Sequence, residues 1–581
     1  MNHHENGGTE FSVCPRPEYP RPRLRRKNNW LNLNGEWFFE TDPGRSAEDR
    51  KFYERDSLSG KIVVPFVPES ELSGVGITDF MPAVCYMRRV CLPESWLSDG
   101  RILLHFGAVD YSAKVWVDSS LAGVHQGGYT PFTLDITEIA GKEFSLSVWA
   151  EDDVRSPMQP SGKQAGSYEN NGCFYTRSTG IWQTVWLEHV PALYIRDLKL
   201  TPDVDNACLH ASVNFNLDGQ PQFPVTVRVL AGEEVCAEQT FLSTGRNLEF
   251  SLPVPSPRLW SLEDPFLYDL EISAGEDAVV SYFGMRKAEF NGHVFELNGK
   301  PVFQRLVLDQ GYYPDGIYTA PDDEALKNDI LLSMRAGFNG ARLHMKIFEP
   351  RFLYWADRLG YLVWGEYPNW GLDISRPEAL CSMLAEWLES VRRDYSSPAL
   401  VGWCPFNETW NPLQRIYDTV LLATRMVDPY RPVIDSSGWK RGTDAEICDT
   451  HNYIQEPGPF REYFEEMKTD PSKAPGSEPY NPHRAGQPYW VSEFGGTWWN
   501  IDGGENGWGY GQAPASPKEF YERYEGLVSA LLDHPMMFGF CYTQLTDVFQ
   551  EKNGLYTFDR KCKFDMDRIC AITSRKAAVE K

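Results

Sequence analysis

The second half of the sequence alternates apolar segments of strand character with amphipathic helical segments, from about residue 286 onward. We count eight apolar segments: 300–308, 339–345, 361–367, 400–408, 432–438, 447–453, 489–496 and 537–544. Helical periodicity follows several of them, as in 322–337, 349–360 and 516–534. Eight strand–helix repeats predict a (β/α)8 TIM barrel. A doubly wound sheet is the alternative, but no G-x-G-x-x-G turn follows the first apolar segment.

The first half of the sequence has a different pattern. Short alternating segments with turn residues between them recur as far as about residue 190, which is typical of a β-sandwich or jelly roll. The next 95 or so residues continue the pattern in a unit of the size of an immunoglobulin-like sandwich. We therefore predict a multidomain chain with four parts: a leader (1–28), a jelly roll (29–190), an immunoglobulin-like β-sandwich (191–285) and a catalytic barrel (286–581).

Charge and composition exclude several classes of partner. A net charge of −25 argues against binding to nucleic acid or to anionic membranes. The basic run at 21–27 lies in a Pro-rich leader, and we interpret it as a solvated arm. No apolar stretch is long enough to span a membrane, and the N-terminus has no signal-peptide core. The twelve scattered cysteines, such as Cys404 and Cys541, indicate buried reduced thiols. We expect a cytoplasmic protein, with a homo-oligomer as one possible assembly.

Two carboxylates stand at the ends of predicted barrel strands. Glu408 ends the fourth strand and Glu493 ends the seventh. The carboxyl ends of barrel strands form the rim where active sites lie, and strands four and seven are on opposite sides of that rim. Two carboxylates facing each other can cleave a glycosidic bond. A separation of about 5–5.5 Å indicates a retaining enzyme, and about 6.5–9.5 Å an inverting one.

Several motifs resemble glycoside hydrolase family 2, which includes β-galactosidases, β-glucuronidases and β-mannosidases. The motifs are "WLNLNGEWFF", "VWVDSSLAGVHQGGYTPFTLDIT", "STGIWQTVWLE", "GFNGARLHM", "ADRLGYLVWGE", "FNE" and "SEFG", and they occur in the family's order. The resemblance covers nearly the whole chain. It implies a retaining mechanism with Glu408 as general acid/base and Glu493 as nucleophile. It also implies that Asn407 holds the sugar 2-hydroxyl.

The resemblance extends to a second group of residues. Arg342, two residues before His344 on one strand face, resembles the family residue that steadies the nucleophile; a structural ion pair is the alternative. Glu366 is placed as a supporting carboxylate. Tyr453, paired in the same way with His451, resembles a hydrogen-bond partner of the nucleophile, although aromatic residues are common in barrels.

Asp309, Asp110, Trp498 and Gln544 complete the predicted binding set. Asp309 could touch a hydroxyl or cap a turn, and Asp110 could reach the barrel mouth from the jelly roll or lie in a surface turn. Trp498 lies in the Gly- and Trp-rich segment after Glu493, as do Trp499 and Trp508, and such flat side chains can stack on sugar rings.

The chain departs from the family in ways that concern the sugar. Many β-glucuronidases hold the sugar carboxylate with an Asn-x-Lys pair, but Glu551 and Asn553 occupy this place. Gln544 stands where a tryptophan is common at the end of strand eight. We therefore expect an exo-acting enzyme for a neutral terminal sugar, galactose or a galactose-like pentose such as arabinose. Mannosidase activity, and with less support glucuronidase activity, are alternatives.

The metal-ligand cluster of the large β-galactosidases has no counterpart in this sequence, so we expect no required metal and no cofactor. A carbohydrate-binding protein that has lost catalysis is the alternative from another class. It would have no reason to keep both glutamates in intact motifs.

Overall fold

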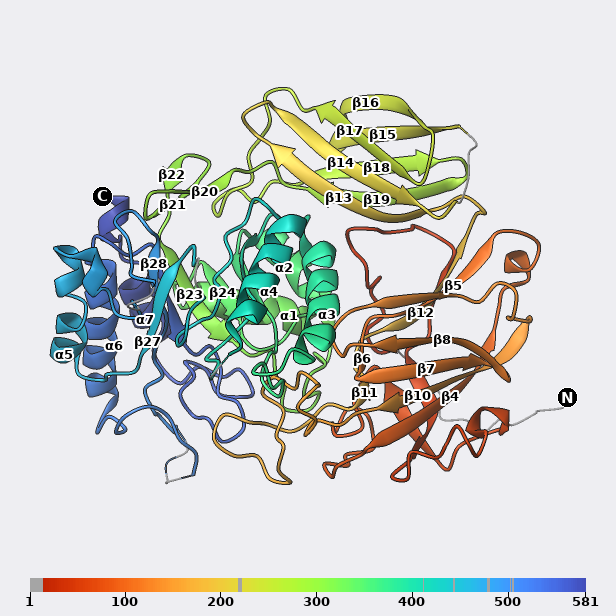
Figure 1. The fold of residues 1–581 in the computed structure, drawn as a ribbon, viewed down its shortest axis with the longest axis horizontal. Helices are drawn as coiled ribbons and strands as arrows, with labels where there is room; N and C mark the ends of the chain where they lie inside the picture. Colours follow the sequence, from red (N-terminus) through yellow and green to blue (C-terminus); the bar gives the residue numbers. More distant parts are fainter. Residues whose placement is uncertain are drawn as a thin grey trace, which may run out of the picture.

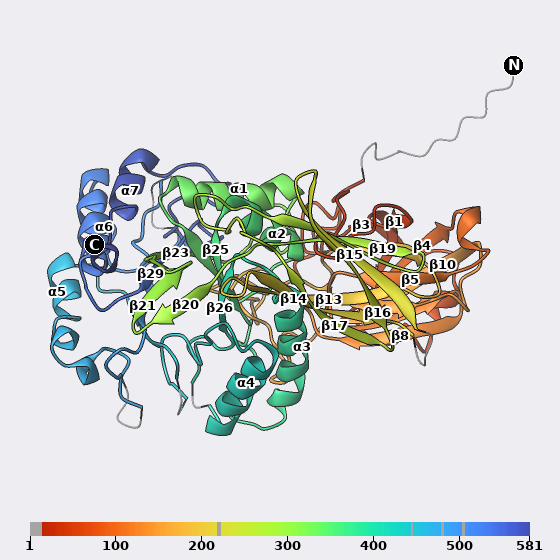
Figure 2. The same cartoon turned by 90° about the horizontal axis from the view of Figure 1, so that it is seen from above.

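The computed structural model describes residues 14–217, 222–410, 412–442, 445–477, 481–501, 503 and 506–581. Three β-rich or mixed units lie side by side (Figure 1). Seen from above, the immunoglobulin-like strands lie over the junction between the barrel and the jelly roll (Figure 2). In the described part of the chain, no helix is both long and apolar enough to cross a membrane.

The jelly roll consists of two antiparallel sheets, ordered β1-β12-β5-β9 and β3-β2-β4-β10-β7-β8, and a short β11-β6 pair. Its strands are β1 (Trp30–Asn32), β2 (Gly35–Thr41), β3 (Gly60–Val64), β4 (Ala83–Cys91), β5 (Arg101–Phe106), β6 (Val109–Asp110), β7 (Ser112–Val117), β8 (Ser120–Gln126), β9 (Phe132–Asp135), β10 (Glu143–Glu151), β11 (Gly180–Ile181) and β12 (Val185–Val190). Apolar side chains from both sheets, including Trp37 and Phe106, pack into one core.

The immunoglobulin-like unit has two sheets, β13-β14-β17 and β16-β15-β18-β19. Its strands are β13 (Ile195–Asp203), β14 (Cys208–Phe215), β15 (Phe223–Ala231), β16 (Glu234–Ser243), β17 (Asn247–Pro253), β18 (Tyr268–Ala274) and β19 (Asp277–Phe283). Buried and more exposed residues alternate along β14 and β18, because successive side chains point to opposite faces of a strand. A small sheet of β20 (Ala288–Asn291), β21 (Val294–Leu297) and β22 (Lys300–Pro301) precedes the barrel.

The barrel sheet is parallel and has the order β26-β25-β24-β23-β29-β28-β27. Its strands are β23 (Gln304–Asp309), β24 (Gly340–Leu343), β25 (Leu362–Glu366), β26 (Leu400–Cys404), β27 (Cys448–Asn452), β28 (Tyr489–Gly495) and β29 (Gly539–Thr543). Its helices are α1 (Asp323–Arg335), α2 (Pro350–Leu359), α3 (Ala379–Asp394), α4 (Gln414–Val427), α5 (Pro457–Glu462), α6 (Pro517–Leu532) and α7 (Met566–Thr573). Most of these strands are buried on both faces, as expected of a parallel sheet covered by helices.

The predicted count of eight regular strands was wrong by one in the described residues. Segment 432–438 makes only two isolated parallel bridges to the chain around β26, at Val433 and Ser437. Backbone hydrogen bonds, among them Glu408 N to Ser437 O at 2.9 Å, still hold the segment in the fifth position. The polar run Asp435-Ser436-Ser437-Gly438 interrupts the continuous apolar run that is typical of a strand buried on both faces. The first predicted strand also divides, because residues 300–301 belong to the small sheet.

The prediction of a solvated basic arm was also wrong. Arg21 and Arg26 both pair with the buried Glu188 of the jelly roll, and Arg26 also pairs with Asp277 of the immunoglobulin-like unit. Arg23 donates to Asp357 of the barrel at 3.0 Å. The segment therefore connects all three units through buried ion pairs.

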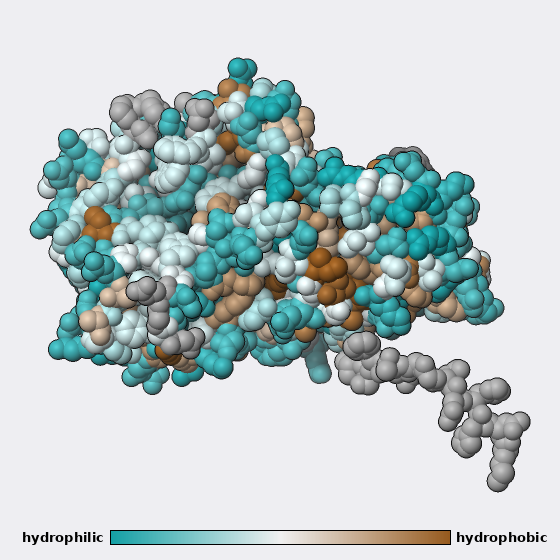
Figure 3. Space-filling view, turned by 90° about the horizontal axis from the view of Figure 1, so that it is seen from below, coloured by the Kyte–Doolittle hydropathy of each residue, from teal (hydrophilic) through white to brown (hydrophobic). Residues whose placement is uncertain are grey.

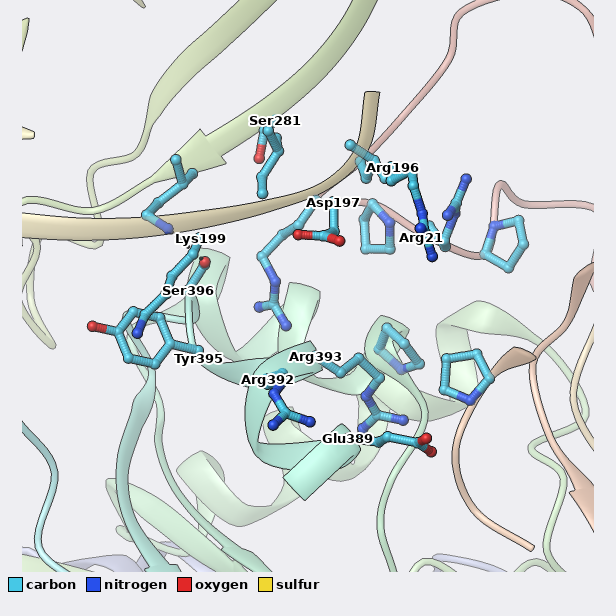
Figure 4. Close-up of a pocket in the computed structure, with 18 of the residues that line it drawn as sticks. Arg21, Arg196, Asp197, Lys199, Ser281, Glu389, Arg392, Arg393, Tyr395 and Ser396 are labelled. Atoms are coloured by element: carbon cyan, nitrogen blue, oxygen red, sulfur yellow. Dashed lines mark hydrogen bonds between the residues drawn. The ribbon is translucent and has the colours of Figure 1, made fainter. Parts of the chain in front are cut away.

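A cavity of about 880 Å³ lies where this segment, β13 and α3 meet. Arg392 and Arg393 from α3 face Arg196 and Lys199 from β13 across it (Figure 4). No carboxylate from the ends of the barrel strands lines this cavity, so it is separate from the candidate active site.

Five of the twelve cysteines are exposed, including Cys14 and Cys381. The prediction that the cysteines are buried therefore holds only for some of them, such as Cys404 and Cys541. On the lower face of the molecule, hydrophilic side chains cover most of the surface and hydrophobic ones form small separate patches (Figure 3).

Candidate active site

The structure brings Glu408 and Glu493 together at the barrel mouth. One carboxylate oxygen of Glu408, one of Glu493 and a ring nitrogen of His451 all lie within 4.8 Å of one another. Glu493 belongs to β28, and Glu408 follows β26 with φ at +36°, a value that residues other than glycine rarely adopt. Such backbone strain concentrates at functional sites. The two carboxylates are therefore close enough to reach a single glycosidic bond.

Arg342 binds two of the carboxylates, Glu366 and Glu493. Its guanidinium, buried on β24, donates to Glu366, to Glu493 Oε1 at 2.9 Å and to Asn407 Oδ1 at 2.7 Å. Burial alone would raise the pKa of Glu366, but Arg342 and His344 outweigh it and lower the pKa to about 2. Arg342 therefore keeps two buried carboxylates ionised. The sequence analysis considered two roles for Arg342, a site residue and a structural ion pair, and the same contacts fit both.

Glu493 has a second set of partners. Tyr453 donates its hydroxyl to Oε2, and His451 Nδ1 lies 3.4 Å from the same oxygen. Burial would raise the pKa of Glu493, but His451 and Arg342 hold it well below its usual value. Glu493 is therefore an anion over the whole neutral range, which is the state that a nucleophile requires.

The environment of Glu408 differs from that of Glu493. Its Oε1 lies 2.6 Å from His451 Nδ1, and its side chain is one-fifth exposed, compared with 6% for Glu493. The other ring nitrogen of His451 lies 2.9 Å from Ser437 Oγ. Glu408 thus reaches the open side of the site, where a leaving group and a water molecule would enter.

Asn407 has one amide atom engaged and one free. Arg342 occupies its Oδ1, whereas Nδ2 is buried and has no hydrogen-bond partner in the described residues. Buried polar groups are normally hydrogen-bonded, so an orphan donor beside two catalytic-type carboxylates is suited to a ligand hydroxyl.

Other predicted residues lie in supporting positions. His344 Nδ1 is 3.0 Å from Glu366 Oε1, and burial lowers the pKa of His344. Asp309 accepts a hydrogen bond from Gly311 N at 2.9 Å. This contact corresponds to the turn-capping role, one of the two roles predicted for Asp309. Asp110 is fully buried and accepts from Gln164 at 2.8 Å, so the surface-turn alternative for it was wrong.

The three tryptophans of the loop after β28 differ in their contacts. Trp499 packs against Phe520 and Phe564 in the hydrophobic core, and Trp508 donates to Gly172 O at 2.6 Å. Trp498 is half-buried, and its indole nitrogen has no partner in the described residues.

An aromatic residue that the sequence analysis missed lies beside the tyrosine that binds Glu493. Tyr510 stacks on Tyr453 with ring centroids 3.4 Å apart. It lies in the same Gly- and Trp-rich segment, so composition marked the loop but not this residue.

A buried amide network forms one wall of the site. Gln544 accepts from Gln310 at 2.6 Å and donates to Asn553 at 2.7 Å, and Asn553 donates to Glu551 at 2.9 Å. Tyr175, from the jelly roll, donates to the other oxygen of Glu551. Sequence reasoning placed Gln544, Glu551 and Asn553 here but not Gln310 or Tyr175.

Replacing Tyr453 with phenylalanine is expected to lower kcat/KM by roughly 10- to 150-fold, because a hydrogen bond to a charged group contributes about 1.5–3 kcal/mol. Loss of the hydroxyl also raises the pKa of Glu493, so the acid limb of the pH–kcat/KM profile should move to higher pH. The exposed Tyr463→Phe serves as the control. An unchanged acid limb together with unchanged kcat/KM would contradict a role for Tyr453 at the nucleophile.

A parallel barrel with two facing carboxylates at its mouth, preceded by two β-sandwich domains, is the architecture of a multidomain glycosidase. Residues 31–191 match the model "Glycosyl hydrolases family 2, sugar binding domain", and residues 193–286 match "Glycosyl hydrolases family 2". Residues 31–191 and 193–286 are therefore domains of the glycoside hydrolase family 2 type, and the chain is a glycosidase that hydrolyses O-glycosyl bonds.

The chain is similar to named members of this class. A β-glucuronidase of Chlorocebus aethiops is 26% identical over 486 residues, which cover 74% of this chain and 72% of the relative. A β-glucuronidase of Paenibacillus borealis is 26% identical over 456 residues, covering 71% and 74%.

Solved structures share the fold. A β-glucuronidase of an uncultured Clostridium species has a TM-score of 0.77 and 22% identity, covering 95% of this chain and 98% of that one. A β-galacturonidase of Eisenbergiella tayi bound to galacturonate has a TM-score of 0.75 and 19% identity, covering 96% and 99%. These relatives are named for uronic acids, so the prediction of a neutral, galactose-like sugar has no support from them.

Proposed function

We propose that the chain is a retaining, exo-acting β-glycosidase that removes one terminal sugar by double displacement. Glu493 attacks the anomeric carbon while Glu408 protonates the departing oxygen, which gives a covalent glycosyl-enzyme. Glu408 then takes a proton from water, which attacks the same carbon and releases the sugar with its original configuration. The observation that carries this proposal is the short separation between one ionised, enclosed carboxylate and one more exposed carboxylate.

The supporting residues follow from this assignment. Arg342 and Tyr453 hold Glu493 in line for attack, and Asn407 Nδ2 is the donor available for the sugar 2-hydroxyl. A hydrogen bond to that hydroxyl can strengthen as positive charge develops on the sugar ring, which favours the transition state over the bound substrate.

The role of Glu408 is tested by the leaving group. Glu408→Gln should lower kcat/KM by about 10²- to 10⁴-fold for alkyl glycosides or disaccharides, whose leaving groups need a proton. The loss in the glycosylation step should be much smaller for dinitrophenyl glycosides, which leave without protonation. Exposed Glu378→Gln is the control. Equal losses for both classes of substrate would assign Glu408 a role other than proton donor.

The configuration of the first product tests the reaction class. NMR of the freshly released sugar should show the β-anomer before mutarotation. Release of the α-anomer would mean an inverting enzyme and would overturn the proposal.

A further inference from the structure

A long loop of the jelly roll, residues 152–179, connects β10 to β11 and runs below the barrel helices in Figure 1, where it is orange. Ser161 N and Gly162 N both donate to Trp370 O, at 2.7 and 3.1 Å. Gly162 has φ at +56°, and a Cβ there would come within 2.6 Å of Met345 O. Only glycine fits this approach, so the position of the next residue, Lys163, is fixed against the barrel.

The side chain of Lys163 is buried, with 6% exposure. Its ammonium lies 4.1 Å from the ring centroid of Trp370, whose indole nitrogen in turn donates to Asn407 O at 3.0 Å. The backbone of Lys163 accepts from Tyr175 N at 2.8 Å, and the hydroxyl of Tyr175 reaches Glu551. Lys163 therefore lies between the sugar-binding amide Asn407 and the wall formed by Glu551.

In the described residues, the Lys163 ammonium makes no hydrogen bond or ion pair of ordinary length. The neighbouring carboxylates have other donors: Glu493 has Arg342 and Tyr453, and Glu408 has His451. A buried ammonium without a hydrogen-bonded partner has lost its hydration. In place of it, Lys163 has a contact with an aromatic face and the longer-range attraction of Glu551, Glu408 and Glu493. Such a cation inside a ligand site is suited to an anionic group of the ligand.

Glu551 opposes the binding of an anionic ligand group less strongly than its position in the sequence suggests. One oxygen accepts from Tyr175 and the other from Asn553. Burial raises the pKa of Glu551, and Lys163 only partly offsets the effect. The carboxyl group is thus directed toward its own donors, Tyr175 and Asn553.

We propose that Lys163 binds the carboxylate of a terminal hexuronic acid, and that the substrate class of the site is a uronide. The inference rests on the proposed function, since it concerns the same sugar subsite. It differs from the predicted neutral sugar because the cation comes from the jelly roll and not from the segment after β29. The positive charge lost with the Asn-x-Lys pair is supplied from another domain.

The test compares sugars that differ only in the carboxylate. Nitrophenyl β-D-glucuronide is paired with the β-D-glucoside, and β-D-galacturonide with the β-D-galactoside. We expect wild type to favour one uronide over its neutral counterpart. Lys163→Met keeps an apolar stem over Trp370 but removes the charge, and it should lower the uronide-to-neutral ratio of kcat/KM by roughly 10- to 150-fold. Lys163→Arg should retain part of that ratio.

Controls separate this inference from the proposed function. Surface Lys142→Met should match wild type on every substrate. Hydrolysis of neutral glycosides that requires Glu408 and Glu493, without preference for a uronide, would overturn the role of Lys163 and leave the proposed function intact. A proportionate loss on both sugars in Lys163→Met would show a structural role and would also overturn it.

Binding supplies a readout that does not depend on turnover. Calorimetry with free D-glucuronate, D-galacturonate and their neutral counterparts, using Glu493→Gln protein, should show weaker uronate binding after Lys163→Met. Equal affinity for the uronates in Glu493→Gln protein with and without Lys163→Met would overturn the inference.

Discussion

Replacing Glu493 with alanine is expected to lower kcat by at least roughly 10⁴-fold, the scale seen when a covalent nucleophile is removed. Without the carboxylate, no glycosyl-enzyme can form. The fold should survive, because Arg342 keeps Glu366 as a partner. Turnover of a dinitrophenyl glycoside by purified protein measures the loss, and thermal unfolding checks the fold. Glu378→Ala serves as the control at an exposed carboxylate.

Added azide distinguishes the two glutamates. In Glu493→Ala, azide can enter the vacated space and attack the anomeric carbon directly, which gives an α-glycosyl azide from a β-glycoside. In Glu408→Ala, azide attacks the glycosyl-enzyme and gives the β-azide. NMR of the products decides between the roles, and exchanged configurations would mean that the two residues had been assigned in the wrong order.

Arg342→Met is expected to lower the free energy of unfolding by about 3–5 kcal/mol, because breaking a buried ion pair leaves its partner charge uncompensated. Two carboxylates, Glu366 and Glu493, lose their shared cation. The effect should depend on pH. Both groups have pKa values depressed in the folded protein, so their stabilisation is present above the unfolded value of about 4.3 and is lost as pH falls through the folded value.

The pH dependence provides the measurement. For Glu366 the stabilising interval ends near a pKa of about 2, so the difference between wild type and Arg342→Met should be largest at neutral pH and should narrow below pH 4. Urea unfolding at several pH values records it. Arg342→Lys should recover part of the stability but not the three-way contact. A difference that is independent of pH would attribute the loss to packing and not to charge.

The sequence was most informative where periodicity sets the fold. The barrel strands were recognisable because they are apolar and buried on both faces, and their ends placed Glu408 and Glu493 on one rim. The prediction of a regular fifth strand was wrong because residues 432–438 combine apolar and polar side chains. This segment is held by backbone hydrogen bonds to β26. The sequence analysis predicted this segment as a strand, but it makes only isolated bridges at Val433 and Ser437.

Residues that act across domains were not predictable from local pattern. Lys163 and Tyr175 lie in a Gly- and Ser-rich stretch of the jelly roll, with no spacing relationship to the barrel motifs. A loop of this length between strands was the available signal, since long loops in compact domains are often functional. The sugar prediction relied on Glu551, Asn553 and Gln544, and it could not take account of the donors that surround the Glu551 side chain.

The arginine segment near the N-terminus has a consequence for how the protein is made. Arg23 meets Asp357 and Asp394, which follow it by 334 and 371 positions. At about 5–20 residues per second, a ribosome needs on the order of tens of seconds to supply those partners. Arg23 therefore stays solvated while the two β-sandwich domains are synthesised. Its ion pairs with the barrel can form only after most of the polypeptide has been translated.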